Sequence, residues 1–229
     1  MNPESIISLD NVSKTYTLSQ ENLVRAVRGV SLDVKRGEFL VITGRSGSGK
    51  TTLLNLIAGL TRPSSGKVFV DGQDLWNLSD RQQSCLRNQK IGFIFQFPSL
   101  LPSLTALENV ALPTIFNSNH EKEIGNPRAL ELIEAVGLKD KVNAVPRQLS
   151  AGQQQRLVIA RALLNQPELL LADESTSDLD EQTEIEIMDL FKQIHQTSGI
   201  TIVLVTHSTQ LVVYGTRSIK MAEGEIVEG

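Results

Sequence analysis

A glycine-rich loop beginning at residue 44 constrains this chain more than any other stretch. Residues 44–51 fit the phosphate-binding template G-x-x-x-x-G-K-[S/T] without a gap. Residues 39–43 are apolar and predict a buried strand, and residues 52–58 have helical spacing. Glycine permits positive φ, so the backbone can wrap around a phosphate with its N–H groups pointing inward. The sequence therefore predicts a nucleotide-phosphate site between a strand and a helix.

The residues of the loop are expected to make different contacts with the nucleotide. The helix that begins near Lys50 adds the positive end of its dipole. Lys50 should reach the β- and γ-phosphates, and the Thr51 hydroxyl should bind Mg²⁺. The expected nucleotide contacts in the loop are Gly44, Arg45, Ser46, Gly47, Ser48, Gly49, Lys50, Thr51 and Thr52.

Two carboxylates, Asp173 and Glu174, end a second apolar run that begins at residue 168. A continuous apolar run is typical of a buried parallel strand. Ligand chemistry gathers at the carboxyl ends of such strands, where the phosphate loop also lies. We therefore expect Asp173 to hold the Mg²⁺ shell and Glu174 to polarise a water for attack on the γ-phosphate. The alternative is that each carboxylate caps a helix.

Three other features remain open on the residues alone. His207 follows the predicted strand 199–205 on the same edge, and is either a phosphate contact or a structural histidine. Tyr16 either stacks on a nucleotide base or is an ordinary strand residue. Residues 97–102 are apolar and broken by proline, so they form either internal packing or a docking surface.

Composition limits the classes of partner. A net charge of −4 argues against broad nucleic-acid binding, which needs a basic surface. No apolar run reaches the roughly 18 residues of a membrane helix, and residues 1–5 do not resemble a signal peptide. Cys85, expected to be an ordinary helix residue, is the only cysteine, so no internal disulfide can form. These features fit a reducing cytoplasm, and any membrane span must come from another chain.

The order of predicted elements indicates an α/β fold in one domain, 1–229. Two antiparallel strands, 6–12 and 24–34, precede the loop and form a β-subdomain beside the nucleotide. Residues of about 1–96 and 166–229 form a phosphate-loop core with a mainly parallel sheet, and about 97–165 form an inserted helical subdomain. Further strands are expected at 67–71, 91–95, 168–174, 199–205, 217–221 and 225–227, helices at 79–87, 105–110, 127–136, 152–165 and 180–197, and a solvated linker around His120.

These motifs, together with residues 149–156 (LSAGQQQR), resemble the ATP-binding cassette (ABC) ATPases, whose signature is usually LSGGQ. Ser150 and Gly152 open a helix, so hydroxyl and N–H groups there can face an anion. The resemblance implies that two ATP molecules are sandwiched between two head-to-tail copies. In that arrangement the signature contacts the partner's ATP through Ser150, Ala151, Gly152 and Gln153. The loop that crosses to the partner is formed by Ser177, Asp178, Leu179 and Asp180.

The resemblance also implies roles for single residues. Tyr16 stacks on adenine, Gln96 contacts Mg²⁺ and the attacking water, and His207 holds the γ-phosphate. Glu174 is the catalytic base. The segment from Gln96 to Pro102 docks a transmembrane permease, which places the chain at the cytoplasmic face of the inner or plasma membrane.

Three residues depart from the usual pattern of that family: Ala151 replaces Gly, Ser175 replaces Pro, and Asp178 replaces Ala. Residues 24–32 and 95–110 resemble the lipoprotein-release and macrolide-export group, whose members use ATP to pull on a membrane subunit. The implied function is an ATPase subunit of an exporter or mechanotransmission system. The alternatives are an importer ATPase, a soluble ABC protein not linked to transport, and a small-molecule kinase with the same loop.

Overall fold

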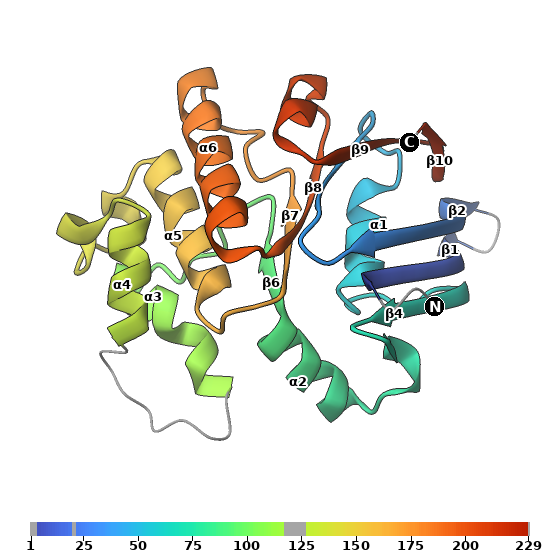
Figure 1. The fold of residues 1–229 in the computed structure, drawn as a ribbon, viewed down its shortest axis with the longest axis horizontal. Helices are drawn as coiled ribbons and strands as arrows, with labels where there is room; N and C mark the ends of the chain where they lie inside the picture. Colours follow the sequence, from blue (N-terminus) through green and yellow to red (C-terminus); the bar gives the residue numbers. More distant parts are fainter. Residues whose placement is uncertain (1–3, 20–21, 117–126, 229) are drawn as a thin grey trace.

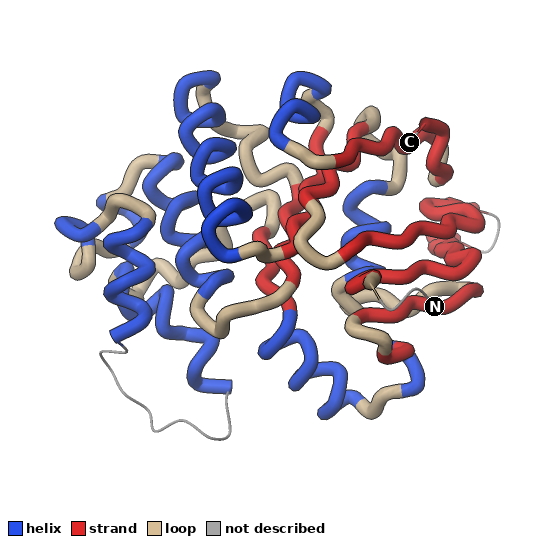
Figure 2. Tube along the Cα trace, in the orientation of Figure 1, coloured by secondary structure: helices blue, strands red, loops and turns tan. Residues whose placement is uncertain are grey.

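The structure is a computed structural model that describes residues 4–19, 22–116 and 127–228. It contains two sheets and a group of helices at one end of the molecule (Figures 1 and 2). The linker around His120 and residues 1–3 lie outside the described residues, so the expectations for those segments stay predictions.

The first sheet is antiparallel, as the sequence predicts, but it has four strands where the sequence indicated two. Its order is β2-β1-β4-β5, so the strand after the first helix returns to pair with β1. Strand β1 is also longer than expected, because it continues through several register shifts as far as Ser19. The strands are β1 Ser5–Ser19, β2 Asn22–Lys35, β4 Ser65–Val70 and β5 Gln73–Asp74.

The second sheet carries the phosphate loop and has the order β10-β9-β3-β8-β7-β6. Its strands are parallel except for the closing hairpin β9–β10, which confirms the predicted mainly parallel core. The strands are β3 Phe39–Thr43, β6 Ile91–Ile94, β7 Leu169–Asp173, β8 Thr201–Thr206, β9 Arg217–Ala222 and β10 Glu225–Glu228.

Both faces of this sheet are buried, which explains the continuous apolar runs in its strands. In β3, Phe39 and Val41 join a core with α3–α6, whereas Leu40 and Ile42 join a core with α1 and the antiparallel sheet. Strands β7 and β8 alternate in the same way. The helices are α1 Lys50–Ile57, α2 Asp80–Lys90, α3 Ala106–Ala111, α4 Pro127–Ala135, α5 Ala151–Leu163 and α6 Glu181–Ser198.

Side-chain caps fix where several helices begin. Ser79, Thr105 and Ser150 each form a capping box at the start of α2, α3 and α5, and Asp180 caps α6. The sequence did not predict the short 3-10 helices η1 Leu75–Asn77, η2 Leu112–Phe116, η3 Lys139–Lys141, η4 Pro146–Gln148 and η5 Thr209–Tyr214.

Between residues 97 and 165 the described chain contains helices and no strand, as predicted. Helices α3, α4 and α5 lie together at one end of the molecule (Figure 1), and share one hydrophobic core with the mainly parallel sheet. The division into a core and a helical subdomain stays a prediction. None of the described helices is both long and apolar enough to span a bilayer.

Candidate functional site

The phosphate loop lies between β3 and α1, in close contact with strands β2 and β9. Gly49 has φ +101°, and a Cβ at this position would stand 2.2 Å from the Ala26 carbonyl oxygen. A Cβ at Gly44 would stand 2.4 Å from the Met221 carbonyl oxygen. Two glycines of the template are therefore required by the close packing of the loop on its neighbours, as well as by backbone wrapping around a phosphate.

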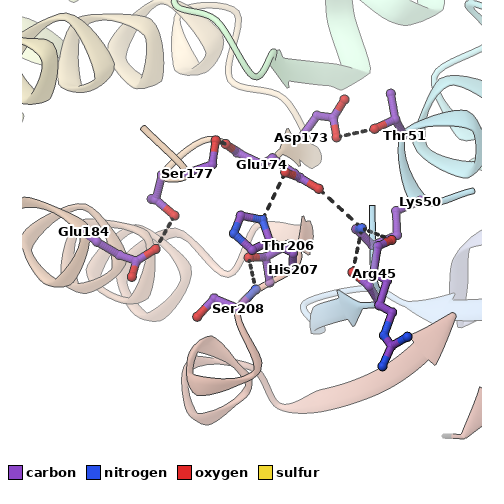
Figure 3. Close-up of polar contacts among 12 residues, drawn as sticks. Arg45, Lys50, Thr51, Asp173, Glu174, Ser177, Glu184, Thr206, His207 and Ser208 are labelled. Carbon is purple, nitrogen blue, oxygen red and sulfur yellow. Dashed lines mark hydrogen bonds and ion pairs between the residues drawn. The ribbon is translucent and has the colours of Figure 1, made fainter. Parts of the chain in front are cut away.

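Lys50 begins α1, and its side chain is almost fully buried beneath the loop. Its Nζ donates hydrogen bonds to the carbonyl oxygens of Gly44 at 2.8 Å and Arg45 at 3.1 Å. The same ammonium lies 3.3 Å from Oε1 of Glu174 (Figure 3). The cation is thus held at the centre of the loop and beside the second carboxylate.

Thr51 and Asp173 come together as the sequence predicts. The Thr51 hydroxyl donates to Oδ1 of Asp173 at 3.0 Å. Burial raises the pKa of the Asp173 carboxyl, and the neighbouring charge of Glu174 raises it further, while the Thr51 hydrogen bond opposes both. A divalent cation would offset this cost, because it favours the ionised carboxylate.

The donor set fits Mg²⁺. A hydroxyl and a carboxylate oxygen are hard ligands, and Mg²⁺ is usually bound by one or two protein oxygens together with waters and substrate phosphates. Within the described chain no cluster of three or more His, Cys, Asp or Glu could enclose a metal. The site therefore suits a cation that arrives with a nucleotide, and suits poorly a metal held by protein ligands alone.

Glu174 follows the end of β7 in a left-handed conformation with φ +42°. Its N–H donates to the Val205 carbonyl oxygen at 3.0 Å, which ties it to β8. Nδ1 of His207, at the end of β8, lies 3.2 Å from Oε2 of Glu174 (Figure 3). Neither Asp173 nor Glu174 caps a helix, because Asp180 caps α6. His207 faces the carboxylate and has a half-exposed side chain.

Three other predicted residues make no hydrogen bond or ion pair with this cluster in the described chain. Among the described residues no hydrogen bond or ion pair joins Tyr16, Gln96 or Ser150 to the carboxylates or to Lys50. Tyr16 lies in β1 with the Lys14 ammonium 5.0 Å from its ring centroid. Gln96 is exposed just beyond β6. The roles assigned to these three residues stay predictions.

The signature begins α5, and there its residues contact the start of α6. Ser150 is exposed, and its hydroxyl accepts from the Gln153 N–H at 3.2 Å. A Cβ at Gly152 would lie 2.5 Å from Cγ2 of Thr183. Ala151, where the family usually has glycine, is exposed.

The segment at 97–102 is held at the surface by hydrogen bonds to its backbone and by packing of one of its side chains. Arg161 donates to the carbonyl oxygens of Pro98 at 3.2 Å and Ser99 at 2.9 Å. Leu100 packs on the core, whereas Phe97 and Leu101 are 66% and 43% exposed. Internal packing is therefore confirmed for Leu100, and the docking surface stays a prediction.

The sequence analysis did not identify Asn109, a residue of α3 that bonds to this segment. The fully buried Asn109 accepts from the Leu101 N–H at 2.8 Å. Its Nδ2 donates to the carbonyl oxygens of Leu101, Leu104 and Thr105 at 3.0–3.2 Å. An amide inside a short helix is unfavourable unless it bonds elsewhere, and that was the available signal.

Fold and site together define a phosphate-loop nucleotide-binding domain with a Lys–Glu–His cluster. A family model described as "ABC transporter" matches residues 27–177. The chain is 47% identical to an uncharacterized ABC transporter ATP-binding protein of Thermotoga maritima, with 97% of this chain and 94% of the relative covered. It is 41% identical to the lipoprotein-releasing system ATP-binding protein LolD 1 of Chlorobium chlorochromatii, with 98% and 91% covered.

A solved structure is also similar. The ATP-binding cassette MJ0796 of Methanocaldococcus jannaschii, captured as a dimer bound to ADP and phosphate, superposes with a TM-score of 0.89 at 43% identity. The alignment covers 97% of both chains. The chain belongs to the ABC transporter family. It is an ATP-binding domain and an ABC-type ATPase, which confirms the resemblance seen in the sequence.

Proposed function

We propose that this chain is an ATPase subunit that closes with a second copy on two Mg-ATP and powers a separate transmembrane permease. One observation carries the proposal. Lys50, Glu174 and His207 converge at one edge of the sheet, while the signature residue Ser150 starts a different helix without contacting them. We infer that these three residues act on the phosphate and water of their own site, and that the signature acts at the site of another subunit.

This chain's own residues supply several groups for the chemical step. Lys50 and the loop N–H groups bind and orient the phosphates, and Thr51 and Asp173 would hold Mg²⁺. When bound, Mg²⁺ neutralises charge on the phosphate oxygens. Glu174 accepts a proton from the attacking water, and His207 contacts the γ-phosphate. Attack of the water oxygen on phosphorus breaks the bond to ADP and yields ADP and phosphate.

A dimer of a relative and the exposure of two residues in this chain support the proposed dimer. The Methanocaldococcus jannaschii cassette was captured as a dimer with ADP and phosphate. In this chain Ser150 and Asp178, in the signature and in the proposed crossing loop, are both exposed. Tyr16 at adenine and Gln96 at the attacking water complete the proposed site.

A Glu174→Gln variant tests this function. Replacing the carboxylate by an amide should leave ATP binding intact and stop turnover, so the variant should shift from monomer to dimer when Mg-ATP is added. Mass in solution by light scattering reports the shift. A Lys50→Met variant is the control and should stay monomeric, because it loses the phosphate contact. A Glu174→Gln protein that hydrolyses ATP at the parental rate would show that Glu174 is not the base.

The permease contact is proposed at the surface formed by Phe97 and Leu101, at the cytoplasmic face of the membrane. Similarity to the lipoprotein-releasing relative favours an exporter or mechanotransmission system over an importer. A Leu101→Asp variant should lose binding to a permease encoded beside this chain while it keeps ATP hydrolysis. Leu60→Asp, at an equally exposed leucine elsewhere, is the matched control. Equal binding by both variants would contradict the assignment of the surface.

A further inference from the structure

The backbone of Glu174 has a conformation that residues with side chains rarely adopt. Its φ is +42°, in the left-handed region. Such a conformation persists only where the surrounding groups fix it, and it is often found at functional sites. The groups that hold Glu174 therefore determine where its carboxylate points.

These groups are few within the described part of the chain. The Glu174 N–H donates to the Val205 carbonyl oxygen at 3.0 Å. The Glu174 carbonyl oxygen accepts two hydrogen bonds, both from Ser177: one from its N–H at 3.2 Å and one from its hydroxyl at 3.0 Å. Figure 3 shows Ser177 beside the backbone of Glu174, while the carboxylate reaches toward Lys50 and His207.

The intervening residue Ser175 does not supply this support. A proline at 175, as the family usually has, would restrict the residue before it to extended backbone. Ser175 imposes no such restriction on Glu174. Its own hydroxyl is buried without a hydrogen-bond partner among the described residues, so it does not hold Glu174.

We propose that Ser177 is a positioning residue for Glu174, acting within its own subunit through the Glu174 carbonyl oxygen. Ser177 also begins the loop that we propose crosses to the second copy, and the next residue, Asp178, is exposed. A contact that the second copy makes with this loop would therefore be transmitted to the Glu174 backbone through Ser177. The inference rests on the proposed role of Glu174 as base.

The experiment compares Ser177→Ala, which removes the hydroxyl, with Ser177→Thr, which keeps it. The matched control is Ser198→Ala, because the Ser198 hydroxyl also donates to a backbone carbonyl, that of Ile194 at 2.7 Å, at the far end of α6. The full chain is used for kcat and KM with Mg-ATP. The same Ser177→Ala change is also made in the Glu174→Gln protein.

Loss of one neutral hydrogen bond should lower the kcat of Ser177→Ala about two- to tenfold while KM for ATP stays unchanged. Ser177→Thr should recover most of kcat, and Ser198→Ala should match the parent. In the Glu174→Gln background the Ser177 change should alter neither the residual rate nor ATP-driven dimerisation.

Three results would overturn the inference. They are an unchanged kcat in Ser177→Ala, a Ser177→Thr variant no better than Ser177→Ala, and weaker dimerisation when Ser177→Ala is added to Glu174→Gln. The last result would assign Ser177 to the subunit contact. A Glu174→Gln protein that turns over normally would instead overturn the proposed base, which is measured without any Ser177 variant.

Discussion

Replacing Gly152 by alanine tests whether the signature glycine is required by packing inside one subunit. The added Cβ would stand 2.5 Å from Cγ2 of Thr183, far inside an ordinary carbon–carbon contact of about 3.5–4.0 Å. The other Thr183 atoms near this position, Cβ and Oγ1, would be 3.8 and 3.9 Å away. The whole conflict therefore comes from one methyl group.

The expected energies follow from that geometry. Overpacking of this kind costs about 1–3 kcal/mol, whereas Gly→Ala in a helix contributes up to about 1 kcal/mol of stability. The single variant Gly152→Ala should therefore lower the free energy of unfolding by up to about 3 kcal/mol. Thr183→Ser removes the methyl group but keeps the hydroxyl that bonds Asp180 at 2.7 Å. The double variant should recover the loss.

The assay is urea unfolding of the parent, both single variants and the double variant, analysed as a double-mutant cycle. We expect the two changes to couple by about 1–3 kcal/mol, because the residues are in contact. Changes that add within about 0.5 kcal/mol would refute the argument. The signature glycine would then be explained by its proposed nucleotide contact alone.

Three further outcomes are expected. Lys50→Met should weaken ATP binding by roughly 2–5 kcal/mol, about 30- to several-thousand-fold, measured by nucleotide titration. The raised pKa of Asp173 contributes stability that is present below its unfolded pKa and lost as pH rises through its folded pKa. Asp173→Asn should therefore unfold at higher urea than the parent at pH 7, and this advantage should disappear in acid. Asn109→Ala removes the side-chain partner of the part-buried Leu101 N–H and Leu104 carbonyl oxygen and should cost about 1–3 kcal/mol, measured as a fall in the free energy of unfolding, while the exposed Asn77→Ala should cost little.

Local patterns in the sequence predicted the sheet and the catalytic edge well. The apolar runs before Gly44 and Asp173 each had one available explanation, a strand buried on both faces. The phosphate-loop template then fixed which edge of the sheet carries the site. Because adjacent parallel strands end at that edge, the order of residues along the chain was enough to place Lys50, Glu174 and His207 together.

The remaining features depend on contacts between segments distant in the chain. The pairing of β4 with β1 has no local signal, since strand 65–70 is separated from β1 by a helix and a loop. The backbone of Glu174 combines a left-handed φ with hydrogen bonds to Val205 and Ser177, and a pattern of residue types does not encode either feature. The Asn109 bonds to the segment at 97–102 were missed although an asparagine inside a short predicted helix was a usable signal.

Helix α5 connects two surfaces that have so far been described separately. Ser150 caps its first turn, and Arg161, in its last turn, holds the backbone at Pro98 and Ser99. The rise of an α-helix puts Ser150 and Arg161 about 16 Å apart along one rigid helix. If α5 moves as a rigid body, a tilt that displaces the signature also displaces the exposed Phe97–Leu101 surface. In the proposed complex, movement of α5 therefore couples closure of the dimer on ATP to force on the permease.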